Sequence, residues 1–200
     1  MMKDKLNRNK KGQITGLLSP FLEKLRMSKV IPWINGKDLL DYGCGSATLL
    51  SLLSSDINYV GIDISSEIIE DCKRKFPTAK FYCLNLEKER LPIDNKFDTV
   101  VMCAVIEHLS NPDGVLRKVK TILRRGGRLI ITTPSPCAEK LLEWGAKLRL
   151  FSKEANEEHK KYFSKDDLYN LAKKNNLSVE HYERFAFGFN QLLVSKKTNE

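Results

Sequence analysis

Two glycines separated by one residue follow an acid at the end of a short apolar run, in the order Leu39-Leu40-Asp41-Tyr42-Gly43-Cys44-Gly45. Glycine has no Cβ, so the backbone can turn tightly at such positions and come close to a ligand. We expect a helix over 46–54 to follow, and its first N–H groups would point at the same ligand. The segment therefore predicts a loop that binds a small polar molecule.

A second acidic residue follows at a distance that suits a nucleoside. The run Tyr59-Val60-Gly61-Ile62-Asp63 reads as a second strand, and Asp63 comes 22 residues after Asp41. An acid at the tip of the second strand of an α/β unit is placed to accept hydrogen bonds from both hydroxyls of a ribose. A nucleoside-containing cofactor is therefore the expected ligand.

The residue types around the loop discriminate between cofactors. A dinucleotide fingerprint requires a third glycine, and Thr48 stands at that position. Asp41 also places a negative charge beside the loop, which would repel a pyrophosphate and attract an ammonium group. S-adenosylmethionine carries an amino-acid head, a sulfonium cation and a ribose, and it carries no phosphate. The charges therefore favour S-adenosylmethionine.

The chain resembles the class I S-adenosylmethionine-dependent methyltransferases, and within them the small-molecule type represented by the quinone-pathway O-methyltransferases. The resemblance covers about residues 38–134. It rests on five segments in the family's order and spacing, namely 39–45, 60–63, 97–101, 107–109 and 123–129. It implies S-adenosyl-L-methionine as the cofactor and S-adenosyl-L-homocysteine as the product.

The resemblance also implies the cofactor contacts. Asp41 would balance the ammonium group, the two glycines would let the chain pass close to the methionine part, and Asp63 would accept the ribose hydroxyls. Asn85 stands where the family commonly has an acid that contacts the adenine amino group, and its side-chain carbonyl can still accept. The expected cofactor-binding set is Asp41, Gly43, Gly45, Asp63, Ile64, Asn85, Leu86, Cys103 and Ala104.

Methyl transfer from a sulfonium needs few catalytic groups. The leaving group departs neutral, so alignment supplies most of the acceleration, and a base is needed only where the acceptor must lose a proton. The predicted catalytic residues are His108, directly after Glu107, and His159, in a His-x-x-x-Phe-Ser segment that resembles one in many small-molecule methyltransferases. For His108, a structural role in fixing its loop stays open as an alternative.

A metal ion is not expected. Several family members with a Glu-His pair carry an earlier glutamate in a Glu-x-x-Glu-His pattern, and use it to hold a divalent metal. Ala104 occupies that place in this chain. The chain therefore departs from the metal-dependent members at a residue that the metal needs.

Strand-like and helix-like segments alternate from residue 38 onward, at the spacing of right-handed βαβ units. We expect strands over 38–42, 58–63, 79–84, 97–103, 127–133, 178–185 and 190–196. We expect helices over 46–54, 66–75, 112–123, 138–149 and 165–175. The last two strands read as a hairpin, which a dehydrogenase of parallel units would lack. The predicted fold is α/β, a Rossmann-like doubly wound seven-stranded sheet, mostly parallel with a C-terminal antiparallel hairpin strand.

The expected methyltransferase domain covers residues 38–200. One segment precedes this domain and another is inserted in it. Residues 1–37 form a basic N-terminal tail and a leading helix, whose pattern begins at Ile14 and should break near Ser19 because of Pro20. Residues 134–164 form an insertion in which apolar and basic side chains are interspersed. We interpret this insertion as a lid over the acceptor site. The first alternative is a helix packed on the sheet edge. The second is a weak contact with a membrane surface.

Composition limits the cellular setting. Five cysteines are an odd number and form no Cys-x-x-Cys pair, which argues against a disulfide framework and a zinc site, and favours a cytoplasmic protein. No apolar run approaches the roughly 20 residues of a membrane span, and no secretory signal is recognisable. The net charge of +9 arises mainly in residues 1–37, where nine Lys or Arg residues accompany two acids. We favour a solubilising tail over an arm that binds phosphates.

Together these features predict a cytoplasmic methyltransferase that acts on a small molecule with an oxygen, nitrogen or carbon nucleophile. A nucleic-acid methyltransferase is one alternative, motivated by the basic N-terminus, although no compact run pairs Arg or Lys with aromatic side chains for stacking. A non-catalytic S-adenosylmethionine-binding partner subunit is another. Acceptor pockets in this fold are built from inserted loops, so the acceptor and the oligomeric state stay open at this point.

Overall fold

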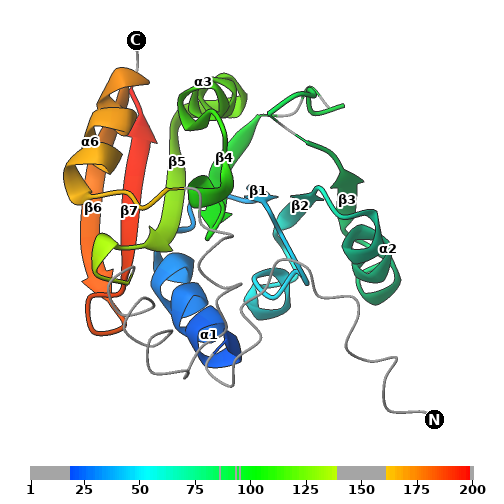
Figure 1. Cartoon of the computed structure of the whole chain (residues 1–200). Helices are drawn as coiled ribbons and strands as arrows, with labels where there is room; N and C mark the ends of the chain where they lie inside the picture. Colours follow the sequence, from blue (N-terminus) through cyan, green and yellow to red (C-terminus); the bar gives the residue numbers. More distant parts are fainter. Residues whose placement is uncertain (1–18, 86, 93, 95, 139–160, 199–200) are drawn as a thin grey trace.

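The computed structural model describes residues 19–85, 87–92, 94, 96–138 and 161–198, which form one mixed sheet flanked by helices (Figure 1). The strands are β1 (Asp38–Tyr42), β2 (Asn58–Asp63), β3 (Lys80–Cys83), β4 (Phe97–Cys103), β5 (Leu123–Pro134), β6 (Leu177–Phe185) and β7 (Asn190–Lys197). Their order is β3-β2-β1-β4-β5-β7-β6. The first five strands run parallel, and β7 lies antiparallel between β5 and β6. The predicted fold class is therefore confirmed.

Helices cover both faces of the sheet. On one face α1 (Ser19–Val30) and α2 (Ser66–Lys75) share a buried cluster with Leu39, and on the other α3 (Pro112–Ile122) and α6 (Lys165–Lys174) share a cluster with Leu40. Both leucines are at most 1% exposed. Parallel strands that are covered on both sides carry apolar residues at successive positions, which is what β1 shows.

Side-chain caps set the starts of three helices. Ser65 caps α2 and Asn111 caps α3, each by accepting a hydrogen bond from the backbone N–H three residues further on. Ser164 and Asp167 form a reciprocal capping box at the start of α6. These side chains satisfy N–H groups that no carbonyl of the same helix can reach.

The helix expected over 46–54 is wrong. The chain runs there through successive turns and one short 3₁₀ helix, η2 (Leu50–Leu52). Gly45 and Ala47 have φ angles of 50° and 56°, in the left-handed region that a right-handed helix does not contain. The Ser51 hydroxyl donates to the Thr48 carbonyl across 2.7 Å, a local alternative to helical pairing. Any ligand at this loop therefore meets loop N–H groups, and not the first turn of a helix.

Smaller differences concern segment ends. β5 begins at Leu123, four residues before the expected start, and its pairing with β4 shifts register between Phe97 and Thr99. Gly126, with a φ angle of 72°, lies at this irregularity, where β5 advances five residues while β4 advances two. The helix expected over 138–149 lies outside the described residues except for 138, as do residues 1–18 and most of the 134–164 insertion.

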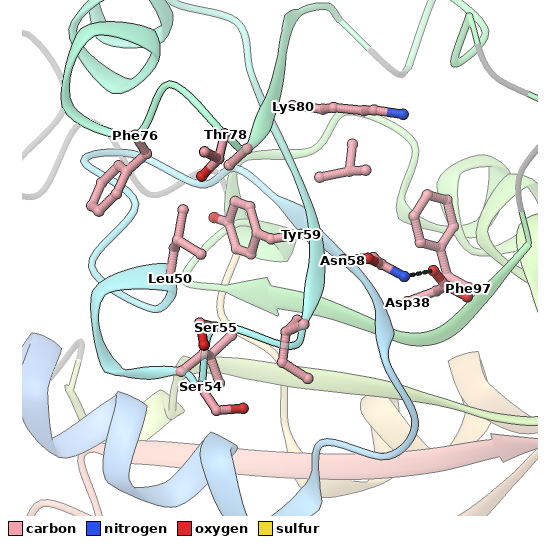
Figure 2. A pocket seen from close by; sticks show the side chains of 14 residues that line it. Asp38, Leu50, Ser54, Ser55, Asn58, Tyr59, Phe76, Thr78, Lys80 and Phe97 are labelled. Atoms are coloured by element: carbon pink, nitrogen blue, oxygen red, sulfur yellow. Dashed lines mark hydrogen bonds between the residues drawn. The ribbon is translucent and has the colours of Figure 1, made fainter.

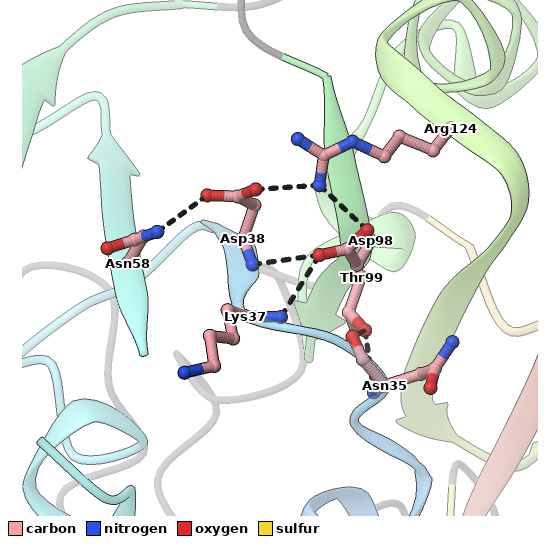
Figure 3. Close-up of polar contacts among 7 residues, drawn as sticks. All are labelled: Asn35, Lys37, Asp38, Asn58, Asp98, Thr99 and Arg124. Atoms are coloured by element: carbon pink, nitrogen blue, oxygen red, sulfur yellow. Dashed lines mark hydrogen bonds and ion pairs between the residues drawn. The ribbon is translucent and has the colours of Figure 1, made fainter. Parts of the chain in front are cut away.

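Asp98 ties the strands together at the edge where they begin (Figure 3). Its Oδ2 accepts the N–H groups of Lys37 and Asp38, each across 3.0 Å. Its Oδ1 accepts from Arg124 across 2.7 Å, and the same guanidinium nitrogen donates to Asp38 Oδ2 across 2.6 Å. The network links β1, β4 and β5, so it fixes the relative positions of strands whose other ends carry the candidate site.

Candidate cofactor site

The predicted cofactor residues gather at the carboxyl edge of the sheet. In the parallel register Asp41 lies beside Gly61 and Val101, and Asp63 lies beside Cys83. β1 and β4 are neighbours in the sheet. After β1 the chain adds β2 and β3 on one side, and after β4 it adds β5 on the other side. Ligands of open α/β sheets bind at such a switch point, outside the carboxyl ends of the strands.

The glycine loop bends from β1 toward β2. The N–H groups of Gly43 and Cys44 both donate to the Ile62 carbonyl, across 2.8 and 2.9 Å. The N–H group of Gly45 donates to Asp63 Oδ2 across 3.1 Å. The loop and the second-strand acid, which sequence reasoning treated separately, therefore form one hydrogen-bonded unit.

The two glycines have different reasons to lack a side chain. Both have a positive φ, 77° at Gly43 and 50° at Gly45. A Cβ on Gly43 would lie 2.4 Å from Val105 Cγ2, whereas a Cβ on Gly45 would meet no protein atom within 4 Å. The space beside Gly45 is thus open on the side where a ligand is expected, which fits a group that approaches the backbone closely.

Asp63 and Ile64 together present a polar group and an apolar face. Asp63 is half-buried, and its Oδ1 accepts the N–H of Ser65 across 3.0 Å. The next residue, Ile64, is 74% exposed, which is unusual for a large apolar side chain in this protein. A carboxylate beside an exposed apolar side chain suits a ribose joined to a flat base.

Asp41 is buried and lacks a cationic partner among the ion pairs of the described residues. Its Oδ2 accepts from the Tyr59 hydroxyl across 2.6 Å. Burial raises the pKa of Asp41 to about 7, the Tyr59 hydrogen bond lowers it, and the nearby charge of Asp63 raises it further. A cationic ligand group would stabilise the ionised form of this carboxyl.

Three further residues of the predicted cofactor-binding set lie at or shortly after the ends of β3 and β4. Asn85 follows β3 and is half-buried, and its Oδ1 accepts the N–H of Glu87 across 3.0 Å. Cys103 ends β4, where burial raises the pKa of its thiol to about 12. Ala104 has a φ of 54° and donates its N–H to the Thr132 carbonyl across 2.8 Å. Leu86 lies outside the described residues.

The structure describes one of the two predicted catalytic histidines. His108 is exposed on η3 (Ile106–His108), the 3₁₀ turn directly after β4. His159 lies outside the described residues. Those residues contain no group of three or more His, Cys, Asp or Glu side chains that could hold a metal.

Glu107 and Tyr59 were not singled out by sequence reasoning. Glu107 is 1% exposed, its Oε2 accepts from the Thr133 hydroxyl across 2.9 Å, and its Oε1 has no hydrogen-bond partner within the described part of the chain. Burial raises the pKa of this carboxyl. The Glu-His pair in the sequence placed a polar residue after the strand that became β4, but it did not indicate that Glu107 is buried. Tyr59 reads as one apolar residue of a buried strand, and its contact with Asp41 becomes visible only in the register of β2 against β1.

A cavity of about 630 Å³ lies at the opposite edge of the sheet (Figure 2). It is lined by residues at the amino ends of the strands, among them Asp38, Asn58 and Lys80, and by the ring of Tyr59. Since ligands of this sheet class bind at the carboxyl ends, we assign the cofactor to the Gly45 edge and not to this cavity.

Strand order, antiparallel C-terminal strands and an acidic glycine loop at the switch point define the class, which is a Rossmann-like S-adenosylmethionine-dependent methyltransferase domain. The family model described as "Methyltransferase domain" matches residues 8–182, and the chain belongs to this family. S-adenosylmethionine is accordingly the cofactor of the domain.

Two curated relatives act on different kinds of acceptor by name. The ubiquinone biosynthesis O-methyltransferase of Aeromonas salmonicida is 26% identical over 152 residues, which are 72% of this chain and 64% of that protein. The tRNA U34 carboxymethyltransferase of Hahella chejuensis is 35% identical over 106 residues, which are 50% of this chain and 33% of that protein. The chain thus spans between about a third and two thirds of these relatives.

Solved structures share the fold at low identity. Magnesium protoporphyrin IX methyltransferase from Synechocystis PCC 6803, solved with bound S-adenosylhomocysteine, has a TM-score of 0.71 and 16% identity, over 94% of this chain and 90% of that one. The methyltransferase in a complex with the Trm112 activator of Haloferax volcanii has a TM-score of 0.71 and 17% identity, over 89% of each chain.

Proposed function

We propose that the protein transfers the methyl group of S-adenosylmethionine to a small-molecule acceptor with an oxygen, nitrogen or carbon nucleophile. The observation that carries the proposal is the open space beside Gly45, whose N–H donates to the oriented carboxylate of Asp63, at the sheet edge where the buried carboxyl of Asp41 also lies. A cation, a ribose and no phosphate match this distribution of charge. The small-molecule acceptor is supported by the ubiquinone-pathway relative, which matches 72% of the chain.

We assign the cofactor contacts to residues at the carboxyl edge. Asp41 would hold the ammonium group, Gly43 and Gly45 the methionine part, and Asp63 the ribose hydroxyls. Asn85, Leu86 and Ile64 would hold the adenine, and Cys103 and Ala104 the methyl end. When bound, S-adenosylmethionine supplies an electrophilic methyl group on a sulfonium.

The chain's own contribution to the reaction is alignment and proton removal. His108, exposed on η3 after β4, would take a proton from the acceptor when the nucleophile is a hydroxyl or an amine. His159 is a second candidate for the same role. Within the 38–200 domain, the 134–164 insertion would cover the acceptor, and residues 1–37 would add the basic tail and leading helix.

The proposal is tested by incubating the protein with labelled S-adenosylmethionine and a panel of phenols, amines and carbon acids. We expect methyl transfer to at least one class, and a loss of roughly 10²- to 10⁴-fold in kcat for His108→Ala with a hydroxyl acceptor. His181→Ala is the matched control. His181 lies on β6, where its ring stacks on Trp33 with ring centroids 4.5 Å apart, and it is not among the residues proposed to contact the acceptor. Full turnover by the His108 variant would contradict its role as base.

A tRNA acceptor is the second candidate function, favoured by the 35% identical carboxymethyltransferase and by the net charge of +9. Bulk tRNA in the same assay distinguishes the two. Deletion of residues 1–12 should abolish polyanion binding if nucleic acid is the acceptor. A non-catalytic partner subunit would bind the cofactor and transfer no methyl group to either panel.

Among the described residues no helix is long and apolar enough to cross a membrane. We propose a cytoplasmic location from the cysteine pattern. The alternative role of the 134–164 insertion is a weak contact with a membrane surface. Flotation with anionic vesicles would test that contact directly.

A further inference from the structure

Tyr59 and Asp41 lie on neighbouring strands and share a short hydrogen bond. The Tyr59 hydroxyl donates to Asp41 Oδ2 across 2.6 Å, and both residues are 4% exposed. Figure 2 shows the ring of Tyr59 among the residues that line the cavity at the amino edge. The side chain therefore extends from that cavity to the carboxyl group of a proposed cofactor residue.

The strand register explains this reach. Leu39 pairs with Tyr59, and Asp41 pairs with Gly61, so Tyr59 and Gly61 share a face with the two β1 residues. Gly61 has no side chain between the hydroxyl and the carboxyl. A Cβ at that position would lie 2.7 Å from the Phe81 ring. The Phe81 ring and Cys44 Sγ, which would lie 3.0 Å from the same Cβ, occupy the space that a side chain there would need.

The surroundings of Asp41 supply no compensating positive charge among the described residues. Asp63 from β2 acts on Asp41, and Cys44 from the loop and Cys72 from α2 act on Tyr59. The thiol of Cys103, at the end of β4, lies close enough for the charge of Asp41 to raise its pKa. Arg26 of α1 acts on Cys103 but forms no ion pair with Asp41 in the described residues. Burial raises the pKa of Tyr59 well above its usual range, so the tyrosine keeps its proton and donates.

We propose that Tyr59 is a positioning residue of the cofactor site, which orients the Asp41 carboxyl and holds it in the ionised form that an ammonium group requires. The inference rests on the proposed role of Asp41 in holding the cofactor. One carboxyl oxygen is engaged by the tyrosine, which leaves the other for the ligand. Cofactor affinity is therefore coupled to pH through this pair.

The size of the effect follows from the fraction of Asp41 that is ionised. With a pKa of about 7, half of the carboxyl is ionised at pH 7. Tyr59→Phe removes the interaction that lowers this pKa. A rise of about one unit leaves roughly a tenth ionised, so the apparent Kd rises about five-fold at pH 7 and less than two-fold at pH 8.5.

The test is calorimetric titration with S-adenosylhomocysteine at pH 6, 7, 8 and 8.5, on the wild type, Tyr59→Phe and Asp41→Asn. Tyr182→Phe is the matched control, since the Tyr182 hydroxyl also donates between strands, to Gln191 Oε1 across 3.0 Å. Replacement of all tyrosines by 3-fluorotyrosine, a stronger donor, is the second test, and it should move the pH midpoint downward.

The outcomes separate the inference from the proposed function. A pH-dependent loss in Tyr59→Phe, absent in Tyr182→Phe and with a flat profile in Asp41→Asn, supports the positioning role. An unchanged profile in Tyr59→Phe, or a loss of equal size at every pH, overturns it while the proposed function stands. A folded wild type that binds no S-adenosylhomocysteine at any pH contradicts the proposed function, and the inference falls with it.

Discussion

The N–H group of Gly45 donates to Asp63 Oδ2 across 3.1 Å, so the loop after β1 and the acid at the end of β2 hold each other in place. The other oxygen of Asp63 accepts from the Ser65 N–H, which fixes the orientation of the carboxylate. The group is therefore oriented before a ligand arrives, and less conformational entropy is lost on binding.

Replacing Asp63 should separate binding from folding. Asp63→Ala removes the acceptor for two hydroxyls and the anchor of the loop, so we expect S-adenosylhomocysteine affinity to fall about 100-fold or more. Asp56→Ala, an exposed acid before β2, is the control and should bind as the wild type does. Calorimetry measures both, and an Asp63 variant within three-fold of the wild-type Kd, about 0.7 kcal/mol, would refute the ribose contact.

The two loop glycines should respond differently to alanine. Gly45→Ala meets open space, and Ala47 already has a φ of 56° in the same loop, so we expect a cost of about 1 kcal/mol in stability and a marked loss of cofactor affinity. Gly43→Ala would collide with Val105 and should cost about 2–3 kcal/mol. Urea denaturation and calorimetry distinguish these effects.

A double variant controls the comparison. Val105→Ala removes the atom that a Cβ on Gly43 would meet, so it should restore part of the stability lost in Gly43→Ala. If Gly45→Ala binds S-adenosylhomocysteine as tightly as the wild type, the open space beside Gly45 is not used by the cofactor.

Asp41 should make the unliganded protein less stable as the pH rises. Its pKa is about 7 in the folded protein, against the ordinary value of 3.8 for an aspartate, so the folded state holds the proton more tightly. The stability linked to this proton is fully present below pH 3.8 and is lost as the pH rises through 7. The pKa difference corresponds to at most about 4 kcal/mol.

Asp41→Asn removes this titration. We therefore expect the unliganded variant to be more stable than the wild type at pH 8, by up to the same amount, and to bind the cofactor more weakly. Thermal unfolding between pH 5 and 8 measures the effect. A wild-type stability that does not fall relative to the variant over this range would contradict the raised pKa.

Asp98 should matter for stability and not for chemistry. Burial would raise its pKa, but the Arg124 and backbone hydrogen bonds outweigh burial and lower it. Asp98 therefore stabilises the protein above the unfolded-state pKa, and this contribution is lost as the pH falls through the folded-state value. Asp98→Ala leaves two N–H groups without their acceptor and should cost about 2–4 kcal/mol.

The matched variant for this position is Asp98→Asn, which keeps one acceptor oxygen and should cost less. Cofactor affinity per folded molecule should be unchanged in both, because the network joins residues at the starts of the strands, whereas Gly45 follows the end of β1. A selective loss of affinity in a stably folded Asp98→Asn would contradict this division.

Sequence patterns predicted the strands and the acids at their ends well. A parallel sheet brings the carboxyl ends of its strands to one edge, so placing Asp41 and Asp63 at strand ends was enough to predict that they share an edge. The loop between them was harder. Its composition suits a helix, but Ala47 has a positive φ, and the N–H groups of Gly43 and Cys44 are bonded to Ile62 of β2.

Contacts across strands were beyond simple periodicity. Tyr59 reads as one apolar residue of a buried strand, and its partner Asp41 follows only from the register of β2 with β1. Glu107 reads as a polar residue after a strand, whereas the turn of η3 directs it against Thr133 in the interior. Both depend on neighbours far apart in the sequence.

The central claim is tested most directly by calorimetric titration of the purified wild-type protein at pH 8 with S-adenosylmethionine, S-adenosylhomocysteine and NAD, beside Asp63→Ala. We expect dissociation constants on the order of micromolar for the first two, no binding of NAD, and loss of both interactions in the variant. Binding of NAD, or a folded wild type that binds neither S-adenosyl compound, would contradict the assignment of this edge to S-adenosylmethionine.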